Sequence, residues 1–370
     1  MRECLIFAHG GGMNMPQTEL PAIGKISPEA FRDYIYPNLG DSRPEVLVGP
    51  QSGVDIAITR VAPGTVMATT TDPVFIVPAY GWDRAAWFAV HILASDAATS
   101  GLPPSLMTVD LNLPLSITTE QFRSLWTAFS RTCKQLGIAV ISGHTARYEG
   151  CEFPMVGGAT VMSIGSEERY ITTAMAERGD IILCTKGAAI EATGLFAATF
   201  PDYVQKHLGH DILSRADALF EKMTVVEDAG VAAAQGVRGQ GVTAMHDATE
   251  CGVVGGVYEM AESSRLGVIL RDDQIPVKEE TRAICNLTGI DPLISISEGT
   301  LLAAVKPHAV DRVVSALKSR GIEAAIIGEM LDSSQGMWRE SKGKRTLLQH
   351  PRIDPFWAAF GRLAQEGGNR

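Results

Sequence analysis

The sequence predicts an α+β protein built from two domains. A chain of 370 residues is long enough to bury two separate hydrophobic cores. Short β-branched segments alternate with long amphipathic helices, a pattern typical of mixed folds. A second series of strands and helices begins near Gly179-Asp180. We therefore expect a flexible segment at 1–23, an N-terminal domain at 24–170, a C-terminal domain at 171–335 and a tail at 336–370.

In the first half of the chain, glycine and proline residues separate segments with strand or helix patterns. Gly10-Gly11-Gly12, followed by Pro16 and Pro21, prevents regular structure in the N-terminal segment. Asp72-Pro73 is expected to end a strand, and a buried strand is expected to end at Gly143-His144-Thr145. Glycine and proline close the helices. The expected strands are 46–48, 56–58, 65–71, 106–113, 138–142 and 155–164, and the expected helices are 28–35, 85–98 and 119–136.

The second half repeats this alternation with different spacing. Apolar residues at helical intervals follow Asp247 and predict a helix there. The region from 336 onward is polar and carries Phe356 and Trp357, which we expect to anchor the tail to the protein surface. The remaining expected strands are 181–185, 268–270, 301–305 and 324–327, and the remaining expected helices are 189–200, 216–235, 278–287 and 308–320.

Composition excludes several classes of partner. A net charge of −10 argues against nucleic acid or an anionic membrane as the main ligand. No apolar run is long enough to span a bilayer, and the first residues lack the pattern of a signal peptide. The six cysteines form no C-x-x-C pair, which favours reduced thiols. We expect a cytoplasmic protein.

The most informative segment is Met245-His246-Asp247-Ala248-Thr249-Glu250-Cys251-Gly252. It places a histidine, two carboxylates and a hydroxyl directly before a predicted helix. One interpretation is structural, with Asp247 or Thr249 capping that helix. The other is a ligand-binding site. The segment alone leaves both open.

Three aspartates in the first half strengthen the second interpretation. Asp55 follows Gly53-Val54, Asp72 follows Thr70-Thr71, and Asp96 follows Ser95. Each could serve singly in a turn or cap. Together with Asp247 they could converge on hard cations, which prefer oxygen ligands and are shared with nucleotide phosphates.

These motifs, in this order, resemble the AIR synthase-related (PurM-like) superfamily of ATP-using enzymes. The superfamily includes aminoimidazole ribonucleotide synthetase, thiamine-monophosphate kinase, selenophosphate synthetase and the hydrogenase maturation protein HypE. The resemblance covers roughly residues 24–330. The matching segments are 48–57, 70–72, 94–103, 142–145, 179–180, 185–191, 246–262, 297–302 and 327–329.

The resemblance implies a fold and a ligand. It implies an N-terminal domain that pairs across a homodimer to form a β-barrel, a C-terminal α/β sandwich domain, and bound ATP with Mg²⁺. The strands of the N-terminal domain would otherwise leave an apolar sheet face exposed in a monomer. We therefore expect a homodimer.

The resemblance also assigns roles to individual residues. The Mg²⁺ ligands would be Asp55, Asp72, Asp96 and Asp247. The nucleotide contacts would be Gly53, Thr71, Gly143, His144, Thr145 and Lys25. The catalytic residues would be Asp72, Asp247 and His144, although a histidine after a strand is also a common structural hydrogen-bonding group. Lys186 is a further candidate phosphate contact, and Glu191 and Glu298 are either polar groups of the site or helix caps.

The nearest resemblance is to the HypE-like branch, but one feature of its chemistry is missing. Those proteins use a C-terminal Pro-Arg-Ile-Cys ending, whereas this chain has Pro351-Arg352-Ile353-Asp354. A carboxylate cannot supply the thiolate that carries a carbamoyl group. The nucleophile of selenophosphate synthetase is absent from His9–Met13, and His144 stands where thiamine-monophosphate kinase has an aspartate.

Two functional hypotheses follow. The first is an ATP- and Mg²⁺-dependent enzyme that activates an unidentified acceptor, a small molecule or a protein, by phosphoryl transfer. The second is a non-catalytic ATP-binding scaffold or regulatory partner. The four aspartates favour the first hypothesis, and the missing thiol favours the second. An assay of ADP release separates them.

Overall fold

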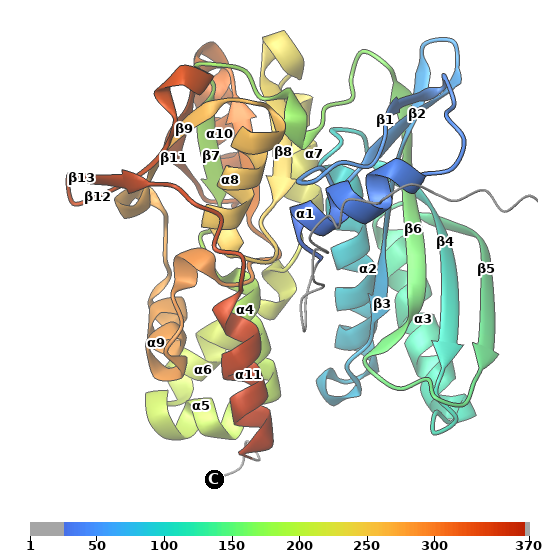
Figure 1. Ribbon diagram of the computed structural model, residues 1–370. Coiled ribbons are helices and arrows are strands. Elements are labelled where there is room, and N and C mark those ends of the chain that lie inside the picture. The colour runs from blue at the N-terminus through green and yellow to red at the C-terminus, as the bar shows by residue number, and fades with distance from the viewer. Residues whose placement is uncertain (1–25, 367–370) are drawn as a thin grey trace, which may run out of the picture. The chain divides into compact units, whose positions relative to one another are not determined.

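The computed structural model describes residues 26–366 (Figure 1). The chain divides into two units, and the division falls between Ser42 and Arg43. Lys25 and the glycine-rich segment lie outside the described residues. The described part of the first unit is helical, as predicted for 28–35. It comprises α1 (Pro28–Ala30), a π-helical turn (Phe31–Ile35) and a 3₁₀ turn (Tyr36–Asn38).

A six-stranded sheet forms the first part of the second unit. Its strand order is β1-β2-β3-β6-β4-β5, antiparallel except for the parallel pair β4 and β5. The strands are β1 (Val46–Val48), β2 (Ala57–Ala62), β3 (Thr65–Phe75), β4 (Pro104–Leu113), β5 (Ala139–Arg147) and β6 (Met155–Ser166).

Two long helices, α2 (Trp82–Ala98) and α3 (Thr119–Gln135), cover one face of this sheet (Figure 1). Thr118 and Gln121 form a reciprocal capping box that fixes the start of α3. Apolar side chains of both helices pack against alternate residues of β4, such as Met107 and Val109, in one buried cluster.

Strand β3 extends further than the sequence predicts. Asp72 and Pro73 were expected to end it, but both pair with β6, opposite Ala159 and Gly158. On the other side β2 pairs with β3 only as far as Thr69. Proline therefore sits where its missing N–H faces a side without a strand partner, as prolines in sheets do.

The expectation of a buried strand at 138–142 is wrong. β5 is exposed along nearly its whole length and continues through Gly143-His144-Thr145. It is the last strand of its sheet, and no other strand of the described chain pairs with its outer edge. An apolar sequence does not ensure burial at the edge of a sheet, and Ile141 is 54% exposed.

A seven-stranded sheet forms the second part of this unit. The strand order is β13-β12-β9-β11-β7-β10-β8. The strands are β7 (Ile181–Thr185), β8 (Val242–Asp247), β9 (Gly267–Arg271), β10 (Leu301–Val305), β11 (Ala324–Leu331), β12 (Met337–Ser341) and β13 (Lys344–Leu347). The two sheets thus lie on either side of the predicted boundary near 170–180.

The helices of this part are shorter and more numerous than the sequence indicates. The predicted helix at 216–235 is interrupted, because Thr224 and Val225 use backbone groups in contacts outside any helix. The helices are α4 (Ile190–Thr199), α5 (Pro201–Leu208), α6 (His210–Asp217), α7 (Val226–Ala234), α8 (Gly252–Ser263), α9 (Glu279–Thr288), α10 (Val310–Ser319) and α11 (Pro355–Gln365).

The segment assigned to the tail is structured. β12 pairs in parallel with β9 and adds β13 to the sheet. Phe356 of α11 is buried against Phe196 of α4, and Phe360 packs beside it, so these two rings hold the segment in place. Trp357, also expected to anchor the segment, is 37% exposed and contacts the ring of Phe356. None of the helices in residues 26–366 combines the length and apolar character needed to cross a bilayer.

We predict that Phe356→Ala destabilises the protein by about 3 kcal/mol, because a fully buried aromatic ring is lost and leaves a cavity. The shift of the urea midpoint measures this. Trp357→Ala is the matched control, since that ring is 37% exposed. Equal midpoints for the two variants would contradict the anchoring role of Phe356.

Candidate functional site

Asp247 ends a buried strand and does not cap a helix. It is the last residue of β8, and α8 begins only at Gly252. The residue before that helix is Cys251, in a left-handed conformation with φ 62°, and no side chain caps the helix. Both carboxylate oxygens of Asp247 are buried without a hydrogen-bond partner among the described residues. The capping interpretation is therefore wrong, and these oxygens are available to a ligand.

His246 connects the two parts of the second unit. Its Nδ1 lies 3.0 Å from Asp55 Oδ2, and its Nε2 lies 2.8 Å from Glu259 Oε2 on α8. The same Nδ1 is 3.7 Å from Asp247 Oδ1. Asp55, His246 and Asp247 each present a ligand atom within 4.8 Å of the others, a grouping that could hold a metal ion.

Gly53 allows the loop that carries Asp55 to approach α8. Its φ of +72° lies in the left-handed region, and a Cβ there would be 3.1 Å from Glu259 Cβ. A larger residue would push the loop away from the helix. Gly53 thus allows Asp55 to lie within reach of His246. This packing gives Gly53 a structural role in addition to the nucleotide contact predicted for it.

Asp72 and Asp96 join the same cluster from the six-stranded sheet and its covering helix. Asp96 lies near the end of α2, is 8% exposed, and accepts a hydrogen bond from Thr70 Oγ1 at 3.1 Å. Its carboxylate also lies within electrostatic reach of Asp72, Asp55 and Asp247. The other three aspartates predicted as metal ligands therefore lie within electrostatic reach of Asp96, and Asp55 and Asp247, with His246, present ligand atoms within 4.8 Å of one another.

The electrostatics of the cluster reflect an excess of negative charge. Burial raises the pKa of Asp96 well above its ordinary value, and the carboxylates of Asp247, Asp72 and Asp55 raise it further. Burial alone would lower the pKa of His246, but Asp55, Asp247 and Glu259 raise it well above its ordinary value. Protons and the imidazolium compensate charge that a bound cation would otherwise neutralise.

Two glutamates extend the acidic region into the C-terminal domain. Glu191, in the first turn of α4, accepts a hydrogen bond from the backbone N–H of Glu298 at 3.0 Å. Burial raises the pKa of Glu191 to about 8, with contributions from Asp354, Glu250 and Asp247. Burial, Asp247 and Glu191 likewise raise the pKa of Glu298 well above its ordinary value. Glu298 Oε2 is buried without a partner among the described residues.

The predicted nucleotide contacts on the sheet form a separate group. Thr71, Gly143 and His144 line a hollow of about 300 Å³ on the sheet face opposite α2. Thr71 Oγ1 is 2.8 Å from Thr160 Oγ1 in the same hollow. Gly143 and Thr145 lie within β5, not in a turn or at a helix start.

The side chain of His144 contacts Tyr148, the residue that directly follows β5. Its Nε2 is 3.0 Å from the Tyr148 hydroxyl, and the two rings are stacked. This contact agrees with the structural interpretation of His144. Its catalytic assignment stays a prediction, as does the nucleotide contact of Lys25, which the described residues do not include.

Sequence reasoning missed several members of the site. Glu259 reaches His246 only because α8 packs beside β8, and no spacing rule links positions 246 and 259. Asp228 also carries no sequence signal: it forms an ion pair with Lys186, which the sequence indicates only as a candidate phosphate contact. The useful signal for Glu259 was a carboxylate on a helix that is otherwise largely buried and apolar.

The fold and this cluster define a class of protein. The sequence profile of the AIR synthase related protein N-terminal domain matches residues 53–164, and that of the C-terminal domain matches 177–338. The chain therefore belongs to the AIR synthase-related family and has its two-domain PurM-like fold.

Within this family the chain is similar to hydrogenase maturation proteins. It is 28% identical over 357 residues to the carbamoyl dehydratase HypE of Escherichia coli, covering 94% of this chain and 97% of that protein. It is 25% identical over 339 residues to a hydrogenase expression/formation protein of Methanocaldococcus jannaschii, covering 90% and 96%.

Solved structures show the same fold. Escherichia coli HypE superposes with a TM-score of 0.65 at 24% identity, covering 78% of this chain and 87% of that one. A hydrogenase maturation protein HypE in complex with ATP superposes with a TM-score of 0.57 at 18% identity, covering 90% and 98%.

We predict that Glu191→Gln flattens the pH dependence of thermal stability in metal-free buffer. The folded protein holds a proton on Glu191 up to about pH 8, whereas the unfolded chain releases it near the ordinary value of 4.5. Raising the pH through that interval therefore destabilises the fold. Gln cannot titrate, so the melting temperature of the variant should fall less between these values.

Glu120→Gln, on the exposed first turn of α3, is the control for this measurement. It should reproduce the pH profile of the parent. Identical slopes for the parent and Glu191→Gln would show that Glu191 titrates normally.

Proposed function

We propose that the protein is an ATP- and Mg²⁺-dependent enzyme that activates a small oxygen- or nitrogen-containing acceptor by phosphoryl transfer. The observation that supports this most directly is the convergence of Asp55, Asp72 and Asp96 from one domain with Asp247 from the other. ATP bound to a related HypE and the carbamoyl dehydratase activity named for the E. coli relative add support from the family.

The chemistry of the donor set suits Mg²⁺. The cluster offers carboxylate oxygens, which hard cations prefer, and the two unpartnered oxygens of Asp247 are buried where a cation would satisfy them. Asp55, Asp72, Asp96 and Asp247 would hold the ion. Bound Mg²⁺ would offset the charge that develops on the transferred phosphoryl group. The chain's own carboxylates would fix its position between the two domains.

The environment of Asp354 supports an acceptor for the phosphoryl group other than a carbamoylated cysteine in the segment that contains Asp354. Asp354 stands where HypE-like proteins carry the cysteine, and it is only 6% exposed. Its Oδ2 accepts from Cys251 N at 2.7 Å, and its Oδ1 accepts from Phe356 N at 2.9 Å. Both oxygens thus anchor α11 to the start of α8, so this residue is held in place and carries no thiolate.

A homodimer would suit the exposed face of the six-stranded sheet. Ile141 of β5 and Met155 and Ile164 of β6 are exposed apolar residues of this sheet. Exposed strand edges of this kind readily pair with another chain. We propose that β5 contributes to a dimer contact and that the barrel expected for the family forms across it.

We predict that Asp72→Asn and Asp247→Asn each weaken Mg²⁺-dependent ATP binding by roughly tenfold or more, that is ~1.4 kcal/mol or more. Each substitution removes a charged oxygen ligand and keeps the side-chain volume. Calorimetry of ATP with and without Mg²⁺ measures the effect. Asp83→Asn is the control, because Asp83 is an exposed carboxylate paired with Arg131 on the protein surface.

The same variants test the reaction. The parent protein with ATP, Mg²⁺ and a panel of small hydroxyl and amine acceptors should release ADP, and both site variants should not. Binding of Mg²⁺ and ATP without any ADP release would favour the scaffold hypothesis. Retention of tight binding by both variants would show that the carboxylate assignment is wrong.

We predict that the parent is a dimer at micromolar concentration and that Ile141→Lys shifts it toward the monomer mass of 39.6 kDa. The lysine places a charge on the apolar edge strand, which disfavours pairing. Light scattering gives the mass. Val61→Lys changes an equally exposed residue at the end of β2 and should leave the dimer intact; a monomeric parent would refute the dimer.

A further inference from the structure

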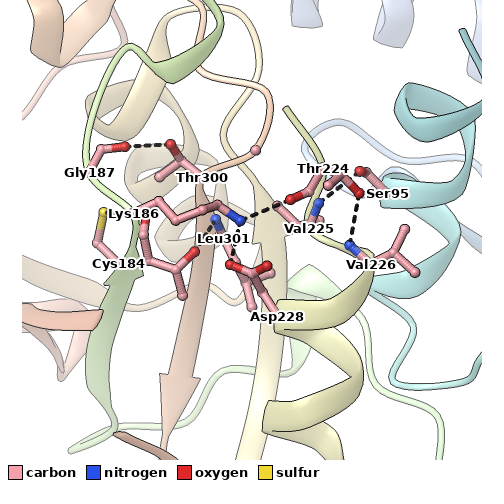
Figure 2. A network of polar contacts seen from close by, with 12 residues as sticks. Ser95, Cys184, Lys186, Gly187, Thr224, Val225, Val226, Asp228, Thr300 and Leu301 are labelled. Carbon is pink, nitrogen blue, oxygen red and sulfur yellow. Dashed lines mark hydrogen bonds and ion pairs between the residues drawn. The ribbon is translucent and has the colours of Figure 1, made fainter. Parts of the chain in front are cut away.

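A buried lysine joins the end of β7 to the first turn of α7. Lys186 directly follows β7 and has a left-handed backbone conformation with φ 59°. Its Nζ donates to Asp228 Oδ1 at 2.6 Å and to the Thr224 carbonyl at 2.9 Å (Figure 2). The Lys186 and Asp228 side chains are 11% and 4% exposed. This ammonium is engaged within the protein, so the geometry does not support the phosphate contact considered for Lys186.

The turn that carries Lys186 lies at the site end of the seven-stranded sheet. Strand register places Cys184 of β7 opposite Leu302 of β10, and Leu302 opposite His246 of β8. Two further hydrogen bonds tie the turn to β10. Thr185 Oγ1 accepts a hydrogen bond from Leu301 N at 3.0 Å. Thr300 Oγ1 donates to the Gly187 carbonyl at 2.6 Å (Figure 2).

The residues held by Lys186 contact the helix that carries Asp96. Val225 N donates to Ser95 Oγ at 3.0 Å, and Thr224 Oγ1 lies 2.8 Å from His91 Nδ1 (Figure 2 shows the Ser95 contact). His91 and Ser95 are one helical turn apart on α2, so they share a face. Burial lowers the pKa of His91 to about 4, which keeps the ring uncharged at neutral pH.

The lysine is energetically necessary for this arrangement. A buried carboxylate that loses its cation is strongly destabilised, so Asp228 without Lys186 would have to move toward water. Asp228 lies in the first turn of α7, which begins at Val226, directly after Thr224 and Val225. A shift of that turn would weaken the hydrogen bond from Val225 N to Ser95 Oγ, and Ser95 is the residue before Asp96.

We propose that Lys186 is a positioning residue for the cation site: it holds residues 224–228 against α2 and so sets the separation of Asp96 in the first domain from Asp247 in the second. This inference rests on the proposed function, in which both aspartates hold a divalent cation. Lys186 itself touches neither the cation nor the nucleotide.

The test uses Mn²⁺ alone, titrated into the full-length protein and followed by electron paramagnetic resonance. Lys186→Met should weaken Mn²⁺ binding by about tenfold or more. Lys306→Met is the matched control, because Lys306 also pairs with a buried aspartate, Asp180, at 2.8 Å, and with the exposed Glu177 at 2.7 Å. Lys306 follows the far end of β10, roughly 16 Å along the strand from the residue that pairs with Asp247. The control should bind Mn²⁺ like the parent even where its melting temperature falls.

Ser95→Ala tests the path from Lys186 to α2. It should also weaken Mn²⁺ binding, and the double variant with Lys186→Met should be no weaker than Lys186→Met alone, because both changes break the same connection. Unchanged affinity in Lys186→Met, or equal losses in both lysine variants, would overturn the proposal. So would strict additivity of Ser95→Ala and Lys186→Met.

Failure of the proposed function gives a different result. If the parent binds no Mn²⁺ and no Mg²⁺ with ATP, the function is refuted, and amide hydrogen exchange then decides the role of Lys186. Faster exchange in 224–228 and 91–98 for Lys186→Met than for Lys306→Met would support the positioning role. Equal exchange in the two variants would refute it.

Discussion

The burial of Asp96, Asp247 and Glu298 close to one another is the physical constraint on which the structure of the site depends. Removing a carboxylate from water costs several kcal/mol unless a proton, a cation or hydrogen bonds compensate it. The described residues supply few cations near these groups, chiefly His246 and Lys186. The protein therefore retains an unbalanced negative charge at the junction of its domains, where a divalent cation would be stabilising.

This charge is assembled only when the two domains are in contact. Asp55, Asp72 and Asp96 come from the first domain, and His246 and Asp247 come from the second. Gly53 permits close packing of one loop on α8, and Ser95 joins α2 to the start of α7. The geometry of the site therefore depends on the contact between the domains. Loosening the packing at Gly53 or the hydrogen bond at Ser95 would separate the carboxylates.

Much of the candidate site could be predicted from sequence because each aspartate follows a recognisable local signal. Asp55 lies two residues after Gly53, Asp72 follows Thr70-Thr71 and Asp96 follows Ser95, and these signals are local. The partners of those aspartates carry no such signal. Glu259 and Asp228 are ordinary helical carboxylates until packing places a histidine or a lysine beside them. Their roles depend on contacts between distant segments, which periodicity does not encode.

By itself the sequence determined the two-domain α+β class, most strand and helix positions and the family, because these depend on local periodicity and ordered motifs. Only the tertiary structure decided the exposure of β5, the continuation of β3 through Pro73 and the break before α7. It also showed that Asp247 ends a strand and that residues 337–347 join a sheet. Each of these outcomes depends on which distant segments lie side by side. The local sequence pattern is the same whether or not such a neighbouring segment is present, so it does not determine these contacts.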